Sequence, residues 1–364
     1  MLFELLRVAL CGAKSVNIEA TIEWAKLYTL ARRQGVTAIV WQAVKQLGEE
    51  GTIPDSMMPD RALKLQWALT AENIAKRYRK QAKAAEELSE AYHNRGISTN
   101  VLKGLAISGY YPTPEHRECG DLDCFLTSKD GNGTMCCRYD EGNKIAAEIG
   151  AKVDIGFYKH SHINYRGLMV ENHAFCTAIR GSRDRKALER HLQSLLATKP
   201  STPINDTPLL KPCADFNALF LTAHSMGHYL TEGIKLRHIL DWAMLLKAEQ
   251  ENIDWQSFYS WCDRMHYTKF ADALTTIAVR HLGLEITNPA IHHNSDLADR
   301  VLEDILFSER SVHNTKASKM KKRLMILRAR LFGGWRYKEL YEKSALLDTM
   351  SMVAGFIFER KPKL

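Results

Sequence analysis

The alternation of apolar and polar positions divides the chain into three regions. Up to about residue 95, apolar residues recur at helical spacing, most clearly in a long predicted helix at Asp60–His93. Shorter runs then alternate between apolar and polar residues, which is the period of a strand. From Ser182 onward the helical period returns. We therefore predict an α+β fold with a small mixed-sheet core and flanking N-terminal and C-terminal helical regions, at 1–95, 96–178 and 179–364.

Residues with strong turn or capping preferences suggest where these elements begin and end. Asn17 can cap a helix that runs to Gln34, and Gly35 offers a stop. Further helices are predicted at Val36–Leu47, Ser182–Ala197, Asp254–Met265 and Thr268–Leu282. The block Phe216–Trp242 contains a histidine-bearing helix and a second helix with Arg237 and Asp241. Strands are predicted at Ile97–Leu102, Gly120–Leu126, Ala151–Phe157, His160–Tyr165 and Leu168–Phe175. Thr127–Gly142 is a predicted loop before a short helix that ends at Ile149, and Lys199–Pro212, with four prolines, is a predicted linker or wrapping loop.

Composition sets broad limits on the class of protein. The 364 residues, 45% apolar and 25% charged, are typical of a globular protein with two or three structural units. A formal charge of +8 favours an anionic partner such as a nucleotide or a nucleic acid. Eight scattered cysteines, none in a Cys-x-x-Cys motif, favour reduced thiols and hence a cytoplasmic location. Met1–Leu10 has the pattern of an amphipathic helix rather than a signal peptide, and we expect no transmembrane segment, since Ser344–Phe358 is too short.

Two carboxylates stand out in the second predicted strand. Alternation places Asp121 and Asp123 on one face, where their side chains project in parallel. Such a pair repels itself strongly at low dielectric and needs a cation to remain ionised. A hard divalent metal, most simply Mg²⁺, suits oxygen-only ligands.

The residues around this pair resemble a known family. Leu102-Lys-Gly104, Tyr110-Tyr-Pro112 and Arg117-x-x-Gly-Asp-Leu-Asp123 are similar to motifs of the bacterial uncharacterised nucleotidyltransferase family. This family is a branch of the DNA polymerase beta-like nucleotidyltransferase superfamily. The resemblance is strongest over Ile97–Phe175 and implies a catalytic core with two carboxylates from one strand and a third from a later strand.

The resemblance also implies roles for individual residues. Glu171 is the preferred third carboxylate, with Asp154 as its rival, so that Asp121, Asp123 and Glu171 would be catalytic residues and would hold two Mg²⁺ ions about 4 Å apart. The superfamily usually has Gly-Ser at the position of Lys103-Gly104, followed by a helix N-terminus that binds phosphate. Lys103 could add a point charge for a triphosphate. The residues assigned to nucleotide binding are Lys103, Gly104, Arg117, Gly120, His228 and Arg237.

Several histidines and charged pairs have alternative interpretations. His160 and His162 share a strand face and could bind a transition metal, but neither a cysteine nor a carboxylate completes a zinc spacing, so we interpret them, with His173, as polar sheet residues near the substrate. Because His224 and His228 lack the glutamate of a His-Glu-x-x-His motif, a metalloprotease is disfavoured. The i, i+4 spacing of Arg237 and Asp241 also suits a plain intrahelical ion pair.

A basic segment near the C-terminus adds a candidate surface. Residues 316–338 contain nine basic and no acidic residues, and the interleaved apolar residues predict an amphipathic basic helix. An RNA-binding face, a membrane-surface contact and a solvated exterior are the competing interpretations.

The favoured function is metal-dependent transfer of a nucleoside monophosphate from a nucleoside triphosphate, such as ATP, to an acceptor hydroxyl that the sequence does not identify. A toxin-like transferase that modifies RNA or protein is one alternative. A non-catalytic nucleotide sensor or scaffold is another, since the Gly-Ser motif is missing.

Overall fold

The computed structural model describes residues 1–14, 16–17, 22–307, 319–331 and 334–358. The α-helices are α1 (Leu2–Cys11), α2 (Trp24–Gln34), α3 (Thr37–Glu49), α4 (Arg61–His93), α5 (Leu105–Ser108), α6 (Tyr139–Glu148), α7 (Arg183–Thr198), α8 (Ala214–Tyr229), α9 (Leu236–Glu249), α10 (Trp255–Met265), α11 (Thr268–Leu282), α12 (Ala298–Phe307), α13 (Lys319–Leu331) and α14 (Ala345–Phe358). The strands are β1 (Ser98–Val101), β2 (Leu122–Lys129), β3 (Met135–Cys137), β4 (Lys152–Asp154), β5 (His160–Tyr165), β6 (Leu168–His173), β7 (Thr202–Pro203) and β8 (Leu209–Lys211). This arrangement confirms the α+β class.

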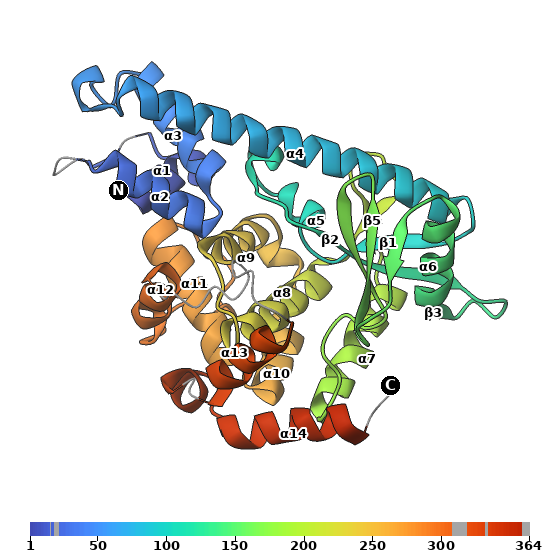
Figure 1. The fold of residues 1–364 in the computed structure, drawn as a ribbon. Coiled ribbons are helices and arrows are strands. Elements are labelled where there is room, and N and C mark those ends of the chain that lie inside the picture. Colours follow the sequence, from blue (N-terminus) through green and yellow to red (C-terminus); the bar gives the residue numbers. More distant parts are fainter. Residues whose placement is uncertain (15, 18–21, 308–318, 332–333, 359–364) are drawn as a thin grey trace.

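The long helix α4 connects the N-terminal helices to the sheet (Figure 1). The Asp60 carboxylate caps it by accepting a hydrogen bond of 2.8 Å from the Leu63 amide. Its first half packs against α3, where Trp67 is fully buried. Its second half lays Ala84, Ala85 and Leu88 on the sheet. A single helix thus contributes both to the core of the helical regions and to the core under the sheet.

The described strands form one mixed sheet in the order β4-β5-β6-β2-β1-β8-β7, with β3 paired to β2. β1 and β2 are antiparallel, whereas β2 and β6 are parallel, so that Asp123 lies opposite Glu171. The proline-rich connector does more than link two regions: its β8 pairs in parallel with β1, through Thr99 and Leu209. The sheet therefore extends beyond the predicted core, which ended at residue 178.

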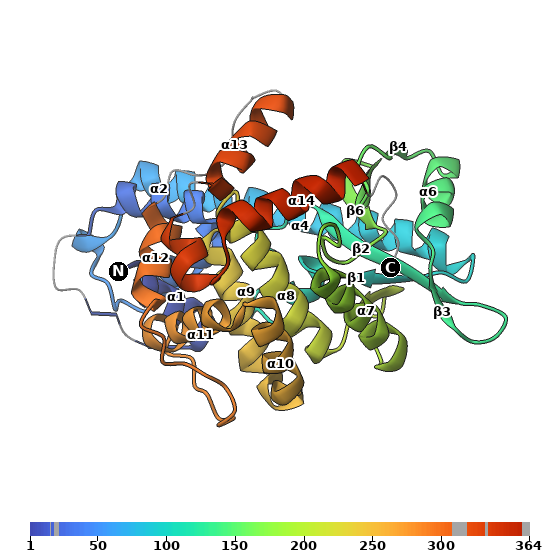
Figure 2. The ribbon, with the colours of Figure 1, turned by 90° about the horizontal axis from the view of Figure 1, so that it is seen from below.

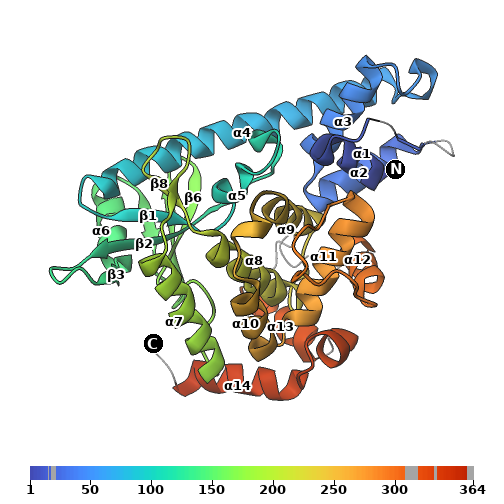
Figure 3. The ribbon, with the colours of Figure 1, turned by 180° about the vertical axis from the view of Figure 1, so that it is seen from behind.

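Alternation along β2 divides its side chains between two cores. Leu122, Cys124 and Leu126 face α4 and α6 and belong to the core under the sheet. Phe125 faces the other way and joins the larger core built from the helical regions. By the same alternation Asp123 shares that second face, and Figure 3 shows α8 and α9 beside the sheet. The strand period therefore directs Asp123 into the junction between sheet and helices.

Some predicted bounds were wrong. α2 begins at Trp24 rather than near Asn17, and residues 18–21 lie outside the described ranges. The predicted loop Thr127–Gly142 contains the end of β2, all of β3 and the start of α6, because the turn at Asp130–Gly133 lets β2 pair back with β3.

The basic segment 316–338 is not one helix in the described residues: α13 ends at Leu331, and a π-helical turn occupies Arg336–Leu340. Arg336 is buried and pairs with Asp304, so this cation belongs to the core rather than to a basic surface. Figure 2 shows α14 extending past α13 toward α7. Asp348 of α14 accepts charged hydrogen bonds from Arg330 at 3.0 Å and from Arg185 at 2.6 Å. No helix within the described ranges combines the length and apolarity needed to cross a bilayer.

Candidate functional site

The predicted acidic pair lies at the beginning of β2. Asp121 immediately precedes the strand and is partly exposed, while Asp123 is its second residue and only 1% exposed. Burial alone would raise the pKa of Asp123, but the Lys103 charge and a hydrogen bond from His173 outweigh it and hold the pKa well below its ordinary value. Asp123 is therefore a buried carboxylate that stays ionised.

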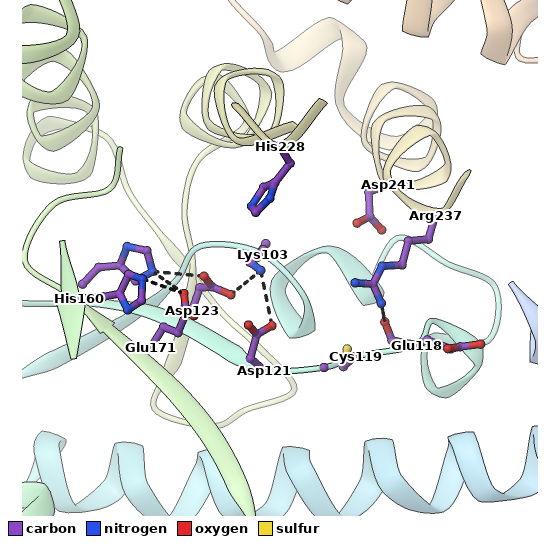
Figure 4. A network of polar contacts seen from close by, with 12 residues as sticks. Lys103, Glu118, Cys119, Asp121, Asp123, His160, Glu171, His228, Arg237 and Asp241 are labelled. Carbon is purple, nitrogen blue, oxygen red and sulfur yellow. Dashed lines mark hydrogen bonds and ion pairs between the residues drawn. The ribbon is translucent and has the colours of Figure 1, made fainter. Parts of the chain in front are cut away.

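Lys103 provides the nearest positive charge. Its Nζ lies 2.8 Å from Asp123 Oδ2 and 3.5 Å from Asp121 Oδ1, between the two carboxylates (Figure 4). Burial lowers the pKa of Lys103, but the two aspartates outweigh it and the net shift is upward. The sequence predicted that this pair would need a cation, and within the described residues a lysine takes that position.

The turn at Gly104 sets the direction of Lys103. Gly104 has φ +64°, a conformation that side chains with a Cβ rarely adopt, and a Cβ there would lie 3.6 Å from the Asp121 carbonyl oxygen. The turn leads into α5, which has only four residues. The helix N-terminus expected to bind phosphate is thus a single turn, and Lys103 is the stronger local source of positive potential.

Glu171 lies beside Asp123, as predicted for a third carboxylate. The two residues are directly paired across the parallel strands β2 and β6, and their carboxylates belong, with His173, to one compact group of potential metal ligands. Asp154 lies on the edge strand β4, which β5 and β6 separate from β2. The arrangement favours Glu171 over Asp154.

His173 connects the buried Asp123 with the half-buried Glu171. Its Nδ1 lies 3.0 Å from the Phe175 carbonyl oxygen, which can only accept, so Nδ1 carries the proton. Its Nε2 lies 3.2 Å from Asp123 Oδ1 and 3.6 Å from Glu171 Oε2. Burial and Lys159 lower the pKa of His173, but its bonds to the two acids raise it above the ordinary value overall. A proton on Nε2 then bridges to Asp123.

A pocket opens next to the acidic pair, between the sheet and helices α8 and α9. The residues that line it and were predicted from the sequence are Lys103, Gly104, Arg117, Gly120, Asp121 and Arg237. The structure therefore brings together residues that are more than 130 positions apart in the chain, from Lys103 to Arg237. The lining carries three cations, Lys103, Arg117 and Arg237, against the two acids Asp121 and Asp241, and this excess of positive charge suits an anionic ligand.

Arg117 is fixed by a buried ion pair. Its Nε donates to Asp241 Oδ1 at 3.1 Å and its Nη2 donates to Oδ2 at 2.5 Å, in a two-pronged contact. Tyr111 also donates its hydroxyl to Asp241 Oδ1 at 2.7 Å. Asp241 thus pairs with Arg117, whereas the Arg237 guanidinium points to the Glu118 carbonyl oxygen at 3.5 Å. The intrahelical alternative for Arg237 and Asp241 is not the arrangement that the structure shows.

The histidines of α8 have different positions. His224 lines the pocket, and burial, followed by the Lys103 charge, holds its pKa well below the ordinary value. His228, the residue predicted from the sequence, lies one turn later with its ring centroid 4.6 Å from that of His224 and Nδ1 3.6 Å from Glu232. Figure 4 shows His228 projecting from α8 toward Lys103.

Sequence reasoning missed three contributors to this site. His224 was recognised only as a neighbour of His228, although both share a helix face. Asp241 was read as a local ion-pair partner, and nothing in the sequence linked it to Arg117. Lys159, whose pKa is lowered by burial, interacts electrostatically with Asp123 and Glu171 from a segment without a motif.

The sheet, the paired acids and the cation-lined pocket define an α+β protein with an acidic site at the junction of sheet and helices. A sequence model of the family described as uncharacterised nucleotidyltransferases matches residues 20–283. The chain therefore belongs to this uncharacterised nucleotidyltransferase family, which supports a general role in nucleotidyl transfer with a nucleotide substrate. Every residue assigned to the site falls within the match. No curated protein and no solved structure matches the chain.

Proposed function

We propose that the chain transfers a nucleoside monophosphate from a nucleoside triphosphate, with Mg²⁺, to an acceptor hydroxyl. The observation that carries this proposal is the direct pairing of Asp123 with Glu171 across β2 and β6, next to Asp121 and a pocket lined by cations. Family membership supplies the reaction class.

The carboxylates fit the proposed metal by their chemistry. Asp121, Asp123 and Glu171 offer oxygen ligands, which Mg²⁺ prefers, and a cation already lies between the first two. When bound, magnesium would activate the acceptor hydroxyl and stabilise charge on the α-phosphate and the leaving pyrophosphate. On this proposal, Lys103 leaves its position between the aspartates and contacts the triphosphate.

The pocket residues have separate roles in the proposal. Arg117, held at two points by Asp241, presents a charge that needs no reorganisation when the triphosphate arrives. Arg237 adds a second guanidinium on the α9 wall, where burial, followed by the Arg117 charge, lowers its pKa. An anionic ligand would relieve the repulsion between these two guanidinium groups.

Calorimetric titration tests the proposal. Each nucleoside triphosphate is titrated with Mg²⁺ into the native protein, the Asp121→Asn/Asp123→Asn variant and the Asp154→Asn control. We expect metal-dependent binding in the native protein and the control, and at least about 100-fold weaker binding in the double variant. Binding of equal strength in all three proteins would contradict the assignment of this site.

The position of Lys103 also favours a second candidate. A lysine 2.8 Å from Asp123 balances the charge of this acid without a metal, which suits a non-catalytic nucleotide sensor or scaffold. Nucleotide binding that persists without Mg²⁺ and is never followed by pyrophosphate release would identify this function. Covalent labelling of RNA or protein from an α-labelled triphosphate would instead identify a toxin-like transferase.

A further inference from the structure

A group of histidines surrounds the outer side of Glu171. β5 and β6 are antiparallel, with His162 directly opposite Glu171 and His160 directly opposite His173. Because side chains alternate along a strand, all four project from the same face of this hairpin. The sequence showed two histidines without a carboxylate partner, and the neighbouring strand provides it.

The distances within this group differ from those of hydrogen bonds. His160 Nε2 lies 3.6 Å from Glu171 Oε2, and His162 Nε2 lies 3.6 Å from Glu171 Oε1. Direct N–H···O hydrogen bonds are about 2.7–3.2 Å long. Two ligands that each lie about 2.1 Å from a tetrahedral metal are separated by about 3.4 Å, which is close to the spacing here. The three groups thus converge without direct hydrogen bonds to Glu171, while the rings of His160 and His162 lie edge to face with their centroids 4.9 Å apart.

The ligand types distinguish this group from the acidic pair. The ligand atoms of His160, His162 and Glu171 all lie within 4.8 Å of one another. Two imidazoles with one carboxylate suit a transition metal of the zinc class, whereas Mg²⁺ prefers oxygen ligands alone. The His162 side chain is 41% exposed and that of His160 is 12% exposed, so an ion can enter from solvent without opening the core.

We propose that His160, His162 and Glu171 bind one Zn²⁺ ion, with a further coordination position open to water. The aspartates of the proposed magnesium site are not ligands of this ion, so the site can exist whether or not the chain transfers nucleotides. Glu171 would be common to both sites: its Oε1 faces His162 and its Oε2 faces His160 and His173.

Cobalt is a suitable spectroscopic probe because Co²⁺ replaces Zn²⁺ and its visible absorption reports nitrogen ligands and coordination number. Chelator-treated native protein is titrated with Co²⁺, and Zn²⁺ or excess Mg²⁺ is then added. We expect one equivalent of visible absorption that Zn²⁺ removes and Mg²⁺ leaves unchanged. The His160→Ala/His162→Ala variant should bind Co²⁺ at least about 100-fold more weakly.

Three further proteins make the result specific. Asn164→Ala changes an exposed residue on the same face of β5, and should keep native Co²⁺ affinity. Asp121→Asn/Asp123→Asn should also keep it. His162→Gln, at the most exposed ligand, provides a folded test if the double histidine variant loses its circular dichroism spectrum.

Three results would overturn the proposal. Native Co²⁺ affinity in His162→Gln or in the double histidine variant would exclude the histidines as ligands. Loss of binding in the aspartate variant alone would place the ion in the acidic site. Weak binding that does not saturate at one equivalent would indicate adventitious metal only. A nucleotide-binding failure would affect none of these readouts, so the two proposals fail separately.

Discussion

Two neighbouring parts of one sheet face differ in how their carboxylates are neutralised. At the start of β2, Asp121 and Asp123 share the ammonium group of Lys103, which lies 2.8 Å from the buried acid. On β5 and β6, Glu171 faces His160 and His162, whose Nε2 atoms both stay 3.6 Å away. One part is a close ion pair, and the other is a looser group of nitrogens around a single acid.

This difference indicates what each part can accept. At the two aspartates, a metal must displace the ammonium group of Lys103. This displacement becomes favourable only when the negative charge of a nucleotide arrives with the metal. Where imidazoles and a carboxylate converge at distances too long for direct hydrogen bonds, a metal completes the arrangement. The comparison indicates that the type of ligand and the counter-charge already present, rather than proximity alone, determine which metal each part prefers.

The largest expected effect is on transfer at the acidic part. Asp121→Asn/Asp123→Asn should reduce pyrophosphate release from a triphosphate by at least about 1,000-fold, or about 4 kcal/mol, because the variant loses ionised ligands for the metal. The reaction is measured with a cell extract of RNA and protein as the acceptor pool. Full activity of the variant would show that the acidic part is not where transfer occurs.

Replacing the lysine tests the counter-charge directly. Lys103→Met leaves Asp123 ionised and buried without its nearest cation, and should lower the free energy of unfolding by about 3 kcal/mol. Urea denaturation with and without Mg²⁺ measures this change, and Mg²⁺ should stabilise the variant more than the native protein. The exposed Lys80→Met is the matched control, with an expected change below about 0.5 kcal/mol. A variant of native stability without Mg²⁺ would refute the role of Lys103.

Two histidines on this face should titrate in opposite directions. Burial lowers the pKa of His160 to about 4. The stability that the neutral ring contributes is therefore fully present above about pH 6.5 and is lost as the pH falls toward 4. We expect this loss to be on the order of 2 kcal/mol after solvent screening. The raised pKa of His173 has the opposite sign: its contribution is present below about pH 6.5 and is lost as the pH rises through the folded value.

Imidazole NMR titration measures both groups, and urea denaturation at several pH values measures their effect on unfolding. At pH 5.5, we expect His160 to be neutral and His173 to be charged. His160→Ala should reduce the loss of stability between pH 6.5 and 4. Parallel titration of the two rings near pH 6.5 would show that neither is affected by its environment.

The smallest effect is expected at the rival acid. Asp154→Asn should change transfer by less than about twofold and stability by less than about 0.5 kcal/mol, because Asp154 lies exposed on the edge strand. Glu171→Gln should reduce transfer about 100-fold in the same assay. If these two results were exchanged, Asp154 would be the third carboxylate.

Local patterns predicted much of this fold because they depend on nearby residues. Strand alternation indicated that Asp121 and Asp123 share a face, and the motif around them led to the family that the sequence match confirms. Strand pairing is not local. The proline-rich connector was read as a linker because prolines disfavour central strands, yet its β8 joins the sheet beside β1.

The candidate site was predictable where one segment carried its residues. Glu171 was predicted from the resemblance of its strand to the family pattern, but its pairing with His162 depends on the β5–β6 register. Asp241 was misread because spacing suggested Arg237 as its partner, while the fold brings Arg117 from 124 positions away. The nucleotide-binding and catalytic roles of these residues stay predictions.

The Arg117–Asp241 ion pair also has a consequence for the order in which the protein is made. Arg117 leaves the ribosome well before Asp241, so the loop leading to Asp121 exists for some time without the partner that fixes it. The pocket wall from α8 and α9 is also synthesised after the sheet. A nascent chain that already contains both acidic strands therefore still lacks a complete pocket, and substrate binding has to wait for the second half of translation.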